Sequence, residues 1–102
     1  MKTIRMRSIV GPTAEDKDTA RTLRESIIRI ELRAGETVTL DFEGVDVVTQ
    51  SFIHALISDL VRRDSSSLDN LVFTNCAPIV RTVITTVVDY SQDQYPPSRS
   101  SS

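Results

Sequence analysis

Hydrophobic and polar positions in the first third of the chain change from a period of two to a helical period. Residues 3–10, TIRMRSIV, alternate polar and apolar side chains, which predicts a half-exposed strand ending at the Gly-Pro pair 11–12. Apolar side chains then recur at spacings of three and four, at Ala20, Leu23, Ile27 and Ile30. This stripe predicts an amphipathic helix with Thr13 as N-cap, Asp16 in a capping-box position, and an end at Gly35.

The remaining pattern predicts two further strands and two further helices. Residues 37–42 and 70–75 form short apolar strands, and residues 45–50 form a brief extended step between them. From Ser51 the period is helical, with an apolar face made by Phe52, Ile53, Leu56, Ile57, Leu60 and Val61. Residues 76–90 are rich in β-branched side chains, yet their length and apolar stripe favour a helix.

Strands alternate with helices along the whole chain, which indicates an α/β fold with a mostly parallel sheet and helices packed against it. We expect residues 37–42 and 70–75 to be neighbouring parallel strands joined by a right-handed crossover. The length of 102 residues suits one domain. We assign residues 1–90 to this domain and expect the Ser/Pro-rich residues 91–102 to form a disordered tail.

Composition and charge exclude several classes of function. The net charge is −2 and there is no block of Lys or Arg, so we expect no nucleic-acid partner. Cys76 is the only cysteine and His54 the only histidine, which rules out an internal disulfide and zinc sites built from several such ligands. We expect no metal and no cofactor. The single cysteine favours the cytoplasm, and we see neither a signal peptide nor a run apolar enough to span a membrane.

A pattern within residues 38–63 resembles a known family. An apolar strand leads into Asp-Phe-x-Gly-Val, and Ser-Phe then opens an apolar helix; the residues are Asp41, Phe42, Gly44, Val45, Ser51 and Phe52. This pattern resembles the STAS-like domain family of uncharacterised function, and the likeness covers roughly residues 11–88. The resemblance implies an α/β domain of the STAS type that acts in bacterial or archaeal signalling.

The wider STAS family includes anti-sigma factor antagonists, and the resemblance to them implies a regulatory role. In those proteins a histidine-kinase-like ATPase phosphorylates a serine where a helix begins, and an ungapped match places that serine at Ser51. The family's preceding Asp and Ser fall on Thr49 and Gln50, and its Gly falls on Phe52. We therefore expect a non-catalytic module that binds a protein partner of that kind through the start of this helix. The predicted surface comprises Thr49, Gln50, Ser51, Phe52, Ile53 and His54.

Several alternatives remain open from the residues themselves. Ser51 is well placed to be a helix N-cap, and Phe52 fits the core as well as an exposed patch. His54 follows Ser51 by three residues, but a nucleophile pair on one helix rarely has the required geometry. Asp41, Glu43 and Asp46 suit turn chemistry or a divalent cation.

Two other classes of function compete with the regulatory one. The first is a small hydrolytic or ligand-binding domain that uses Asp41, Glu43 and Ser51. The second is a structural subunit that forms homo-oligomers. We favour no enzymatic activity, because the sequence contains no recognisable catalytic triad and no phosphate-binding glycine loop.

Overall fold

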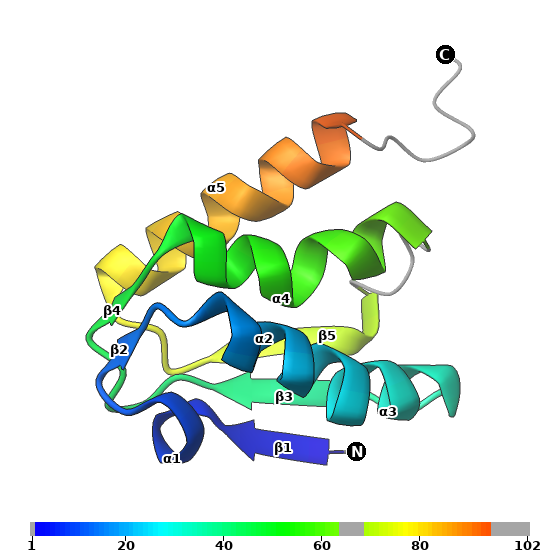
Figure 1. The fold of residues 1–102 in the computed structure, drawn as a ribbon, viewed down its shortest axis with the longest axis horizontal. Helices are drawn as coiled ribbons and strands as arrows, with labels where there is room; N and C mark the ends of the chain where they lie inside the picture. The colour runs from blue at the N-terminus through cyan, green and yellow to red at the C-terminus, as the bar shows by residue number, and fades with distance from the viewer. Residues whose placement is uncertain (1, 64–68, 95–102) are drawn as a thin grey trace.

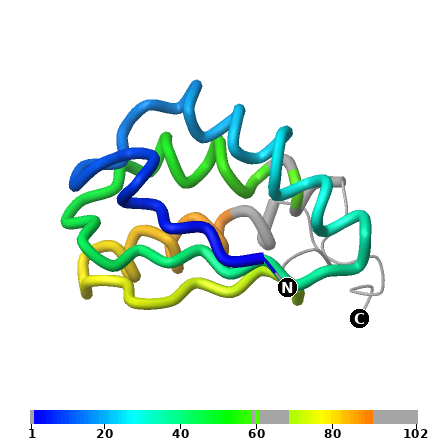
Figure 2. The backbone as a smooth tube through the Cα atoms, turned by 90° about the horizontal axis from the view of Figure 1, so that it is seen from below, coloured from blue at the N-terminus to red at the C-terminus, as the bar shows by residue number. Residues whose placement is uncertain are grey.

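Three short parallel strands form the sheet of the domain in a computed structural model that describes residues 2–63 and 69–94. The strands are β1 (Lys2–Arg5), β3 (Val38–Asp41) and β5 (Leu71–Thr74), in the order β1-β3-β5. Leu40 lies opposite Ile4 on one side and Phe73 on the other. The parallel pairing of β3 with β5 confirms the arrangement predicted for residues 37–42 and 70–75 (Figure 2).

All the long helices cover one face of this sheet (Figure 1). The connections from β1 to β3 and from β3 to β5 step in the same direction across the sheet. Because such connections are right-handed, their helices lie on the same side. Helix α4 (Gln50–Arg63) packs between α2 (Lys17–Leu23) and α5 (Pro78–Gln94). Among the helices that the structure describes, none is long and apolar enough to cross a membrane.

The two faces of the sheet differ in chemistry, as a two-layer fold requires. The face toward the helices carries the buried side chains Ile4, Val38, Leu40 and Leu71. The opposite face carries mostly polar side chains that are exposed or half-buried: Thr3, Arg5, Thr39, Asp41, Val72 and Thr74. The core therefore lies between the sheet and the helices.

The N-terminal strand is shorter than the alternating pattern predicted. Residues 3–10 do not form one strand: β1 ends at Arg5 and a short helix α1 (Met6–Val10) follows. Pairing with β3 stops at the Arg5–Asp41 pair, so residues beyond it lack a neighbouring strand and satisfy their backbone groups in a helical turn. This turn places Met6 in the core.

The first long helix begins later than predicted. Thr13 is not its N-cap, because Thr13–Ala14 form strand β2, which pairs in parallel with β4 (Val47–Val48). The cap is Asp16, whose Oδ1 accepts a hydrogen bond of 2.9 Å from the backbone N–H of Asp18. The predicted extended step at residues 45–50 thus contains a real strand, although a short one.

This helix is not regular along its length. After α2 comes a π-helical turn η1 (Arg24–Ile28), and α3 (Arg29–Arg33) completes the helix. A π turn has more residues per turn than an α-helix. The side chains that follow it therefore point in directions different from those they would have in an uninterrupted α-helix. Consequently Ile28 is 0% exposed, whereas Ile30, predicted to be on the apolar stripe, is 57% exposed.

The last helix, α5, starts at Pro78, within the segment predicted to be helical, and its described part ends at Gln94. Four residues of the predicted tail are therefore helical, and residues 95–102 lie outside the described part of the chain. Helical spacing of Val80, Ile84 and Val87 buries all three against the core despite the β-branched composition.

The π turn makes a paired prediction about stability. Ile28→Ala should lower the free energy of unfolding by about 2–5 kcal/mol, because it leaves a cavity in the core. Ile30→Ala removes an exposed side chain and should change the same quantity by less than about 0.5 kcal/mol. Urea unfolding of both variants measures the difference. Equal losses, or a larger loss for Ile30→Ala, would contradict the described helix.

Candidate functional site

The turn after β3 is built by a carboxylate. Asp41 Oδ1 accepts hydrogen bonds from Asn75 Nδ2 at 3.0 Å and from the backbone N–H of Glu43 at 2.9 Å. These two donors lower the pKa of Asp41, the side-chain bond from Asn75 having the larger effect. Asp41 thus has the turn role considered from the sequence. Within residues 2–63 and 69–94, no group of three or more His, Cys, Asp or Glu side chains could hold a metal ion.

Backbone hydrogen bonds then fix where α4 begins. The N–H groups of Asp46 and Val47 donate to the carbonyl oxygen of Pro12, and the N–H of Thr49 donates to that of Ala14. These bonds tie the segment before α4 to the segment before α2. The start of α4 is consequently held by a short parallel pair rather than by a free loop.

Thr49, not Ser51, caps helix α4. The N–H of Phe52 donates to Thr49 Oγ1 at 3.1 Å, and the N–H of Ile53 donates to the Thr49 carbonyl at 3.2 Å. The interpretation of Ser51 as the N-cap is therefore wrong, because the helix begins at Gln50 and already includes Ser51. Ser51 lies in the first turn with its side chain exposed. Its hydroxyl is left available for other chemistry.

The six residues predicted to bind a partner differ in their exposure: two are buried, one is half-buried and three are exposed. Phe52 and Ile53 are fully buried, so they anchor α4 to the core and cannot contact a partner. Thr49 is half-buried in its capping role. Gln50, Ser51 and His54 are exposed. The predicted surface is thereby reduced to these three side chains on the first turns of α4.

His54 pairs with a different serine from the one considered in the sequence. Its Nδ1 lies 3.2 Å from Ser58 Oγ, one helical turn further along α4. Ser51 has no such contact with the ring among the described hydrogen bonds. The observed pair therefore stabilises the helix surface and does not form a nucleophile and base at Ser51.

A hollow of about 690 Å³ adjoins these exposed residues. It lies between α2, α4 and α5, on the helical side of the domain. Helix α4 contributes Gln50, Ser51, His54, Ala55 and Ser58, and α5 contributes Thr86, Val87 and Tyr90. The structure thus brings Ser51 and His54 into one hollow, but neither Asp41 nor Glu43 lines it. The alternative site of Asp41, Glu43 and Ser51 is not assembled in this hollow.

Three basic side chains line the other wall of the hollow. They are Lys17, Arg21 and Arg24, spaced by four and three residues, so they form one stripe of the helix. This stripe was not predicted, because Arg21 and Arg24 lie off the apolar face from which the helix was predicted. The spacing of four and three residues places the three cations on one side of the helix, but it does not indicate which element that side faces.

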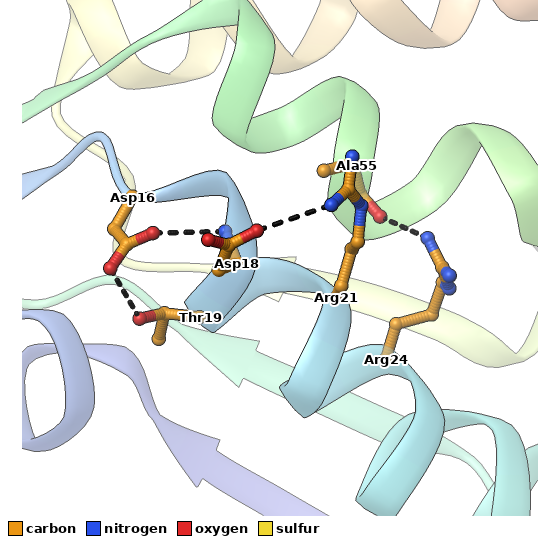
Figure 3. Close-up of polar contacts among 6 residues, drawn as sticks. All are labelled: Asp16, Asp18, Thr19, Arg21, Arg24 and Ala55. Carbon is orange, nitrogen blue, oxygen red and sulfur yellow. Dashed lines mark hydrogen bonds and ion pairs between the residues drawn. The ribbon is translucent and has the colours of Figure 1, made fainter.

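Figure 3 shows the different settings of two of these side chains, Arg21 and Arg24. Arg21 Nη1 lies 3.1 Å from Asp18 Oδ1, in an exposed ion pair one turn apart. Arg24 Nη1 donates to the carbonyl oxygen of Ala55 on α4 at 2.6 Å. Its Nε donates to Glu25 Oε2 at 2.8 Å. Arg24 therefore connects the two helices, whereas Arg21 is held only by a weak surface pair.

Cys76 lies outside this site. It follows β5, is half-buried, and does not line the hollow. Burial raises the pKa of its thiol, which disfavours the reactive thiolate. This agrees with a packing role for Cys76.

The assignment of the cap to Thr49 rather than Ser51 can be tested with one variant of each residue. Thr49→Ala removes the side-chain acceptor of α4 and should cost about 1 kcal/mol of stability. Ser51→Ala changes an exposed position without a cap and should cost less than about 0.5 kcal/mol. Thermal or urea unfolding measures both. A larger loss for Ser51→Ala would mean that Ser51 is the cap after all.

The Asp16 cap predicts a pH dependence. Hydrogen bonds from the Asp18 backbone and from Thr19 lower the pKa of Asp16 in the folded state. Its contribution is therefore complete above the unfolded pKa of about 4 and is lost as the pH falls through the lower folded value. Asp16→Ala should lower the melting temperature at neutral pH by about 4–8 °C.

Asp16→Asn is the matched control, because Asn keeps a capping oxygen but does not ionise. The difference in melting temperature between the unmodified chain and Asp16→Asn should shrink below about pH 4. A difference that is constant from neutral to acidic pH would contradict the role of the Asp16 carboxylate.

Comparison with known proteins gives one match. A family model for the STAS-like domain of unknown function matches residues 19–81, from the first turns of α2 to the start of α5. The match includes all of α4, and it covers more than half of the chain. Neither the curated proteins nor the solved structures provide a significant match. On the family match and the α/β architecture described above, the chain belongs to the family of STAS-like domains of unknown function.

Proposed function

We propose that this domain is a non-catalytic regulatory module that binds a partner protein through the first turns of α4. The observation that carries the proposal is the division of those turns between core and surface. Phe52 and Ile53 fix the helix in the core, while Gln50, Ser51 and His54 point outward beside the hollow. A rigid helix that presents a few exposed side chains is a suitable surface for recognition.

The environment of Ser51 supports its use as a phosphorylation switch. Its side chain is exposed, so a kinase could reach it. Lys17 and Arg21 line the same hollow, and such cations stabilise a phosphate group by charge-assisted hydrogen bonds. A phosphate here would add about two negative charges to the surface without disturbing the core.

The departures from the antagonist pattern are compatible with this role. Phe52 occupies the position of the family's glycine, but its side chain is fully buried and does not protrude toward a partner. Thr49 occupies the position of the acidic residue, and its hydroxyl supplies the helix cap. From the resemblance, we propose a histidine-kinase-like ATPase as the partner.

The arrangement of polar groups favours binding over catalysis. His54 contacts Ser58, and Asp41 is engaged in the turn after β3, so neither is positioned to activate Ser51. This supports the proposal of a module without enzymatic activity of its own.

A charge at position 51 tests the proposal. Ser51→Asp should weaken binding to the ATPase partner about tenfold or more, equivalent to about 1.4 kcal/mol. The reason is that the partner surface meets a neutral hydroxyl in the unmodified chain. Stability should hold, because a negative charge is favourable in the first turn of a helix. Binding is measured by calorimetry with the purified ATPase, and stability by thermal unfolding.

Two controls make the result interpretable. Ser51→Ala removes the hydroxyl without adding charge and should keep binding within about twofold. Ser8→Asp adds the same charge at an exposed serine on α1, outside the hollow, and should also leave binding unchanged. If Ser51→Asp binds the partner as tightly as the unmodified chain, the start of α4 is not the switch.

A further inference from the structure

The hollow between α2, α4 and α5 has a charge opposite to that of the whole protein. The chain carries a net charge of −2. Among the described residues, the lining contains Lys17, Arg21 and Arg24, but no carboxylate. A concave surface with cations on one wall attracts anions and concentrates them.

The three cations are not equivalent toward a ligand. Arg24 is 15% exposed in its side chain and is engaged with Glu25 and the carbonyl of Ala55. Arg21 is 55% exposed, and its partner Asp18 is 79% exposed, so this pair contributes little and yields easily to another anion. Lys17 is also exposed. Arg21 and Lys17 are therefore the groups that would meet an incoming anion, and Arg24 holds the wall in place.

The rest of the lining suits an organic molecule rather than a bare ion. Ala55, Val87 and Tyr90 supply apolar surface, and the exposed hydroxyl of Ser51 supplies a hydrogen-bonding group. The hydroxyls of Ser58 and Thr86 also line the hollow, but they already contact His54 and the carbonyl oxygen of Thr82. The volume of about 690 Å³ is within the range of small-molecule sites, about 300–1,000 Å³. An inorganic ion would fill a small part of this space and leave the apolar wall uncovered.

The backbone supports a site at this place. The π turn η1 begins at Arg24, on the wall of the hollow. Such turns are rare and occur frequently at functional sites, because they are less stable than the α-helix that they interrupt. Here the π turn lets the helix present Lys17 and Arg21 to the hollow while Ile28 enters the core.

We propose that this hollow binds a small organic anion, with a phosphate or carboxylate head against Lys17 and Arg21 and a compact apolar body against Val87 and Tyr90. A ligand there would lie over Ser51 and His54, and would thereby control access to the start of α4. The control of access rests on the proposed function, whereas the binding of the anion does not.

Binding is tested with the full chain alone, so its failure is distinguishable from failure of the partner interaction. Phenyl phosphate and benzoate serve as probes that differ in head group. Inorganic phosphate, which lacks the aryl group, and phenol, which lacks the anionic group, serve as controls. Two-dimensional NMR titration at low salt should show saturable shifts for at least one aryl anion at millimolar concentrations. The tighter of the two identifies the head group. Phenol should not bind, and inorganic phosphate should bind about tenfold more weakly than phenyl phosphate.

A charge-matched pair of variants locates the site. Lys17→Gln with Arg21→Gln should weaken binding of the aryl anion about tenfold or more. Lys2→Gln with Arg33→Gln removes one Lys and one Arg at exposed positions outside the hollow, and should change binding by less than about twofold. Tyr90→Ala should weaken aryl anions but not inorganic phosphate.

Three results would overturn the proposal. The first is the absence of saturable binding for both aryl anions. The second is an equal loss of binding in the two double variants, which would indicate general surface charge. The third is equal affinity for inorganic phosphate and phenyl phosphate, which would show that the apolar part of the ligand does not contribute to binding.

Discussion

Burial of helix α4 is the packing interaction on which the rest of the structure depends. Its apolar side chains Phe52, Ile53, Leu56 and Ile57 are completely removed from solvent. The helix contacts α2 on one side and α5 on the other, above the sheet. Each fully buried side chain of this size contributes about 1.5–3 kcal/mol, so these four outweigh any single polar contact on the surface. Once the apolar face of α4 is buried, its polar side chains Gln50, Ser51 and His54 remain exposed and line the hollow.

The sequence predicted the parts of the fold in which one period dominates. The α/β class and the β3–β5 pairing followed from apolar strands separated by helical stripes, and α4 followed from its broad apolar face. The ends of elements were less predictable, because they depend on partners distant in the chain. Residues 6–10 alternate like a strand, but the strand has no neighbour beyond Asp41, so the alternation does not determine the conformation.

The candidate site was predicted only in part, because some of its residues follow a local pattern and others depend on contacts between distant segments. Ser51 and His54 were found from a local pattern, and the structure places both in the hollow. The cap at Thr49 was missed because Ser is preferred over Thr as an N-cap, and the sequence pattern did not show that the helix already begins at Gln50. Lys17 and Arg21 could not be assigned to the same hollow as Ser51 from sequence, because that requires α2 and α4 to be known neighbours.

The π turn also determines which side chains of this helix face the hollow and which face the core. At about 100° per residue, positions 17, 21, 24 and 28 of an uninterrupted α-helix would share one face. Ile28 would then stand in the row of cations, and Ile30 would return to the core. The η1 turn holds one residue more than an α turn would, so a relative with a single deletion between residues 24 and 28 should have a regular helix in which the cations before the deletion and Ile28 after it keep their directions. The helix thus accommodates one extra residue within a single turn, and neither the cations before this turn nor the core packing after it has to change.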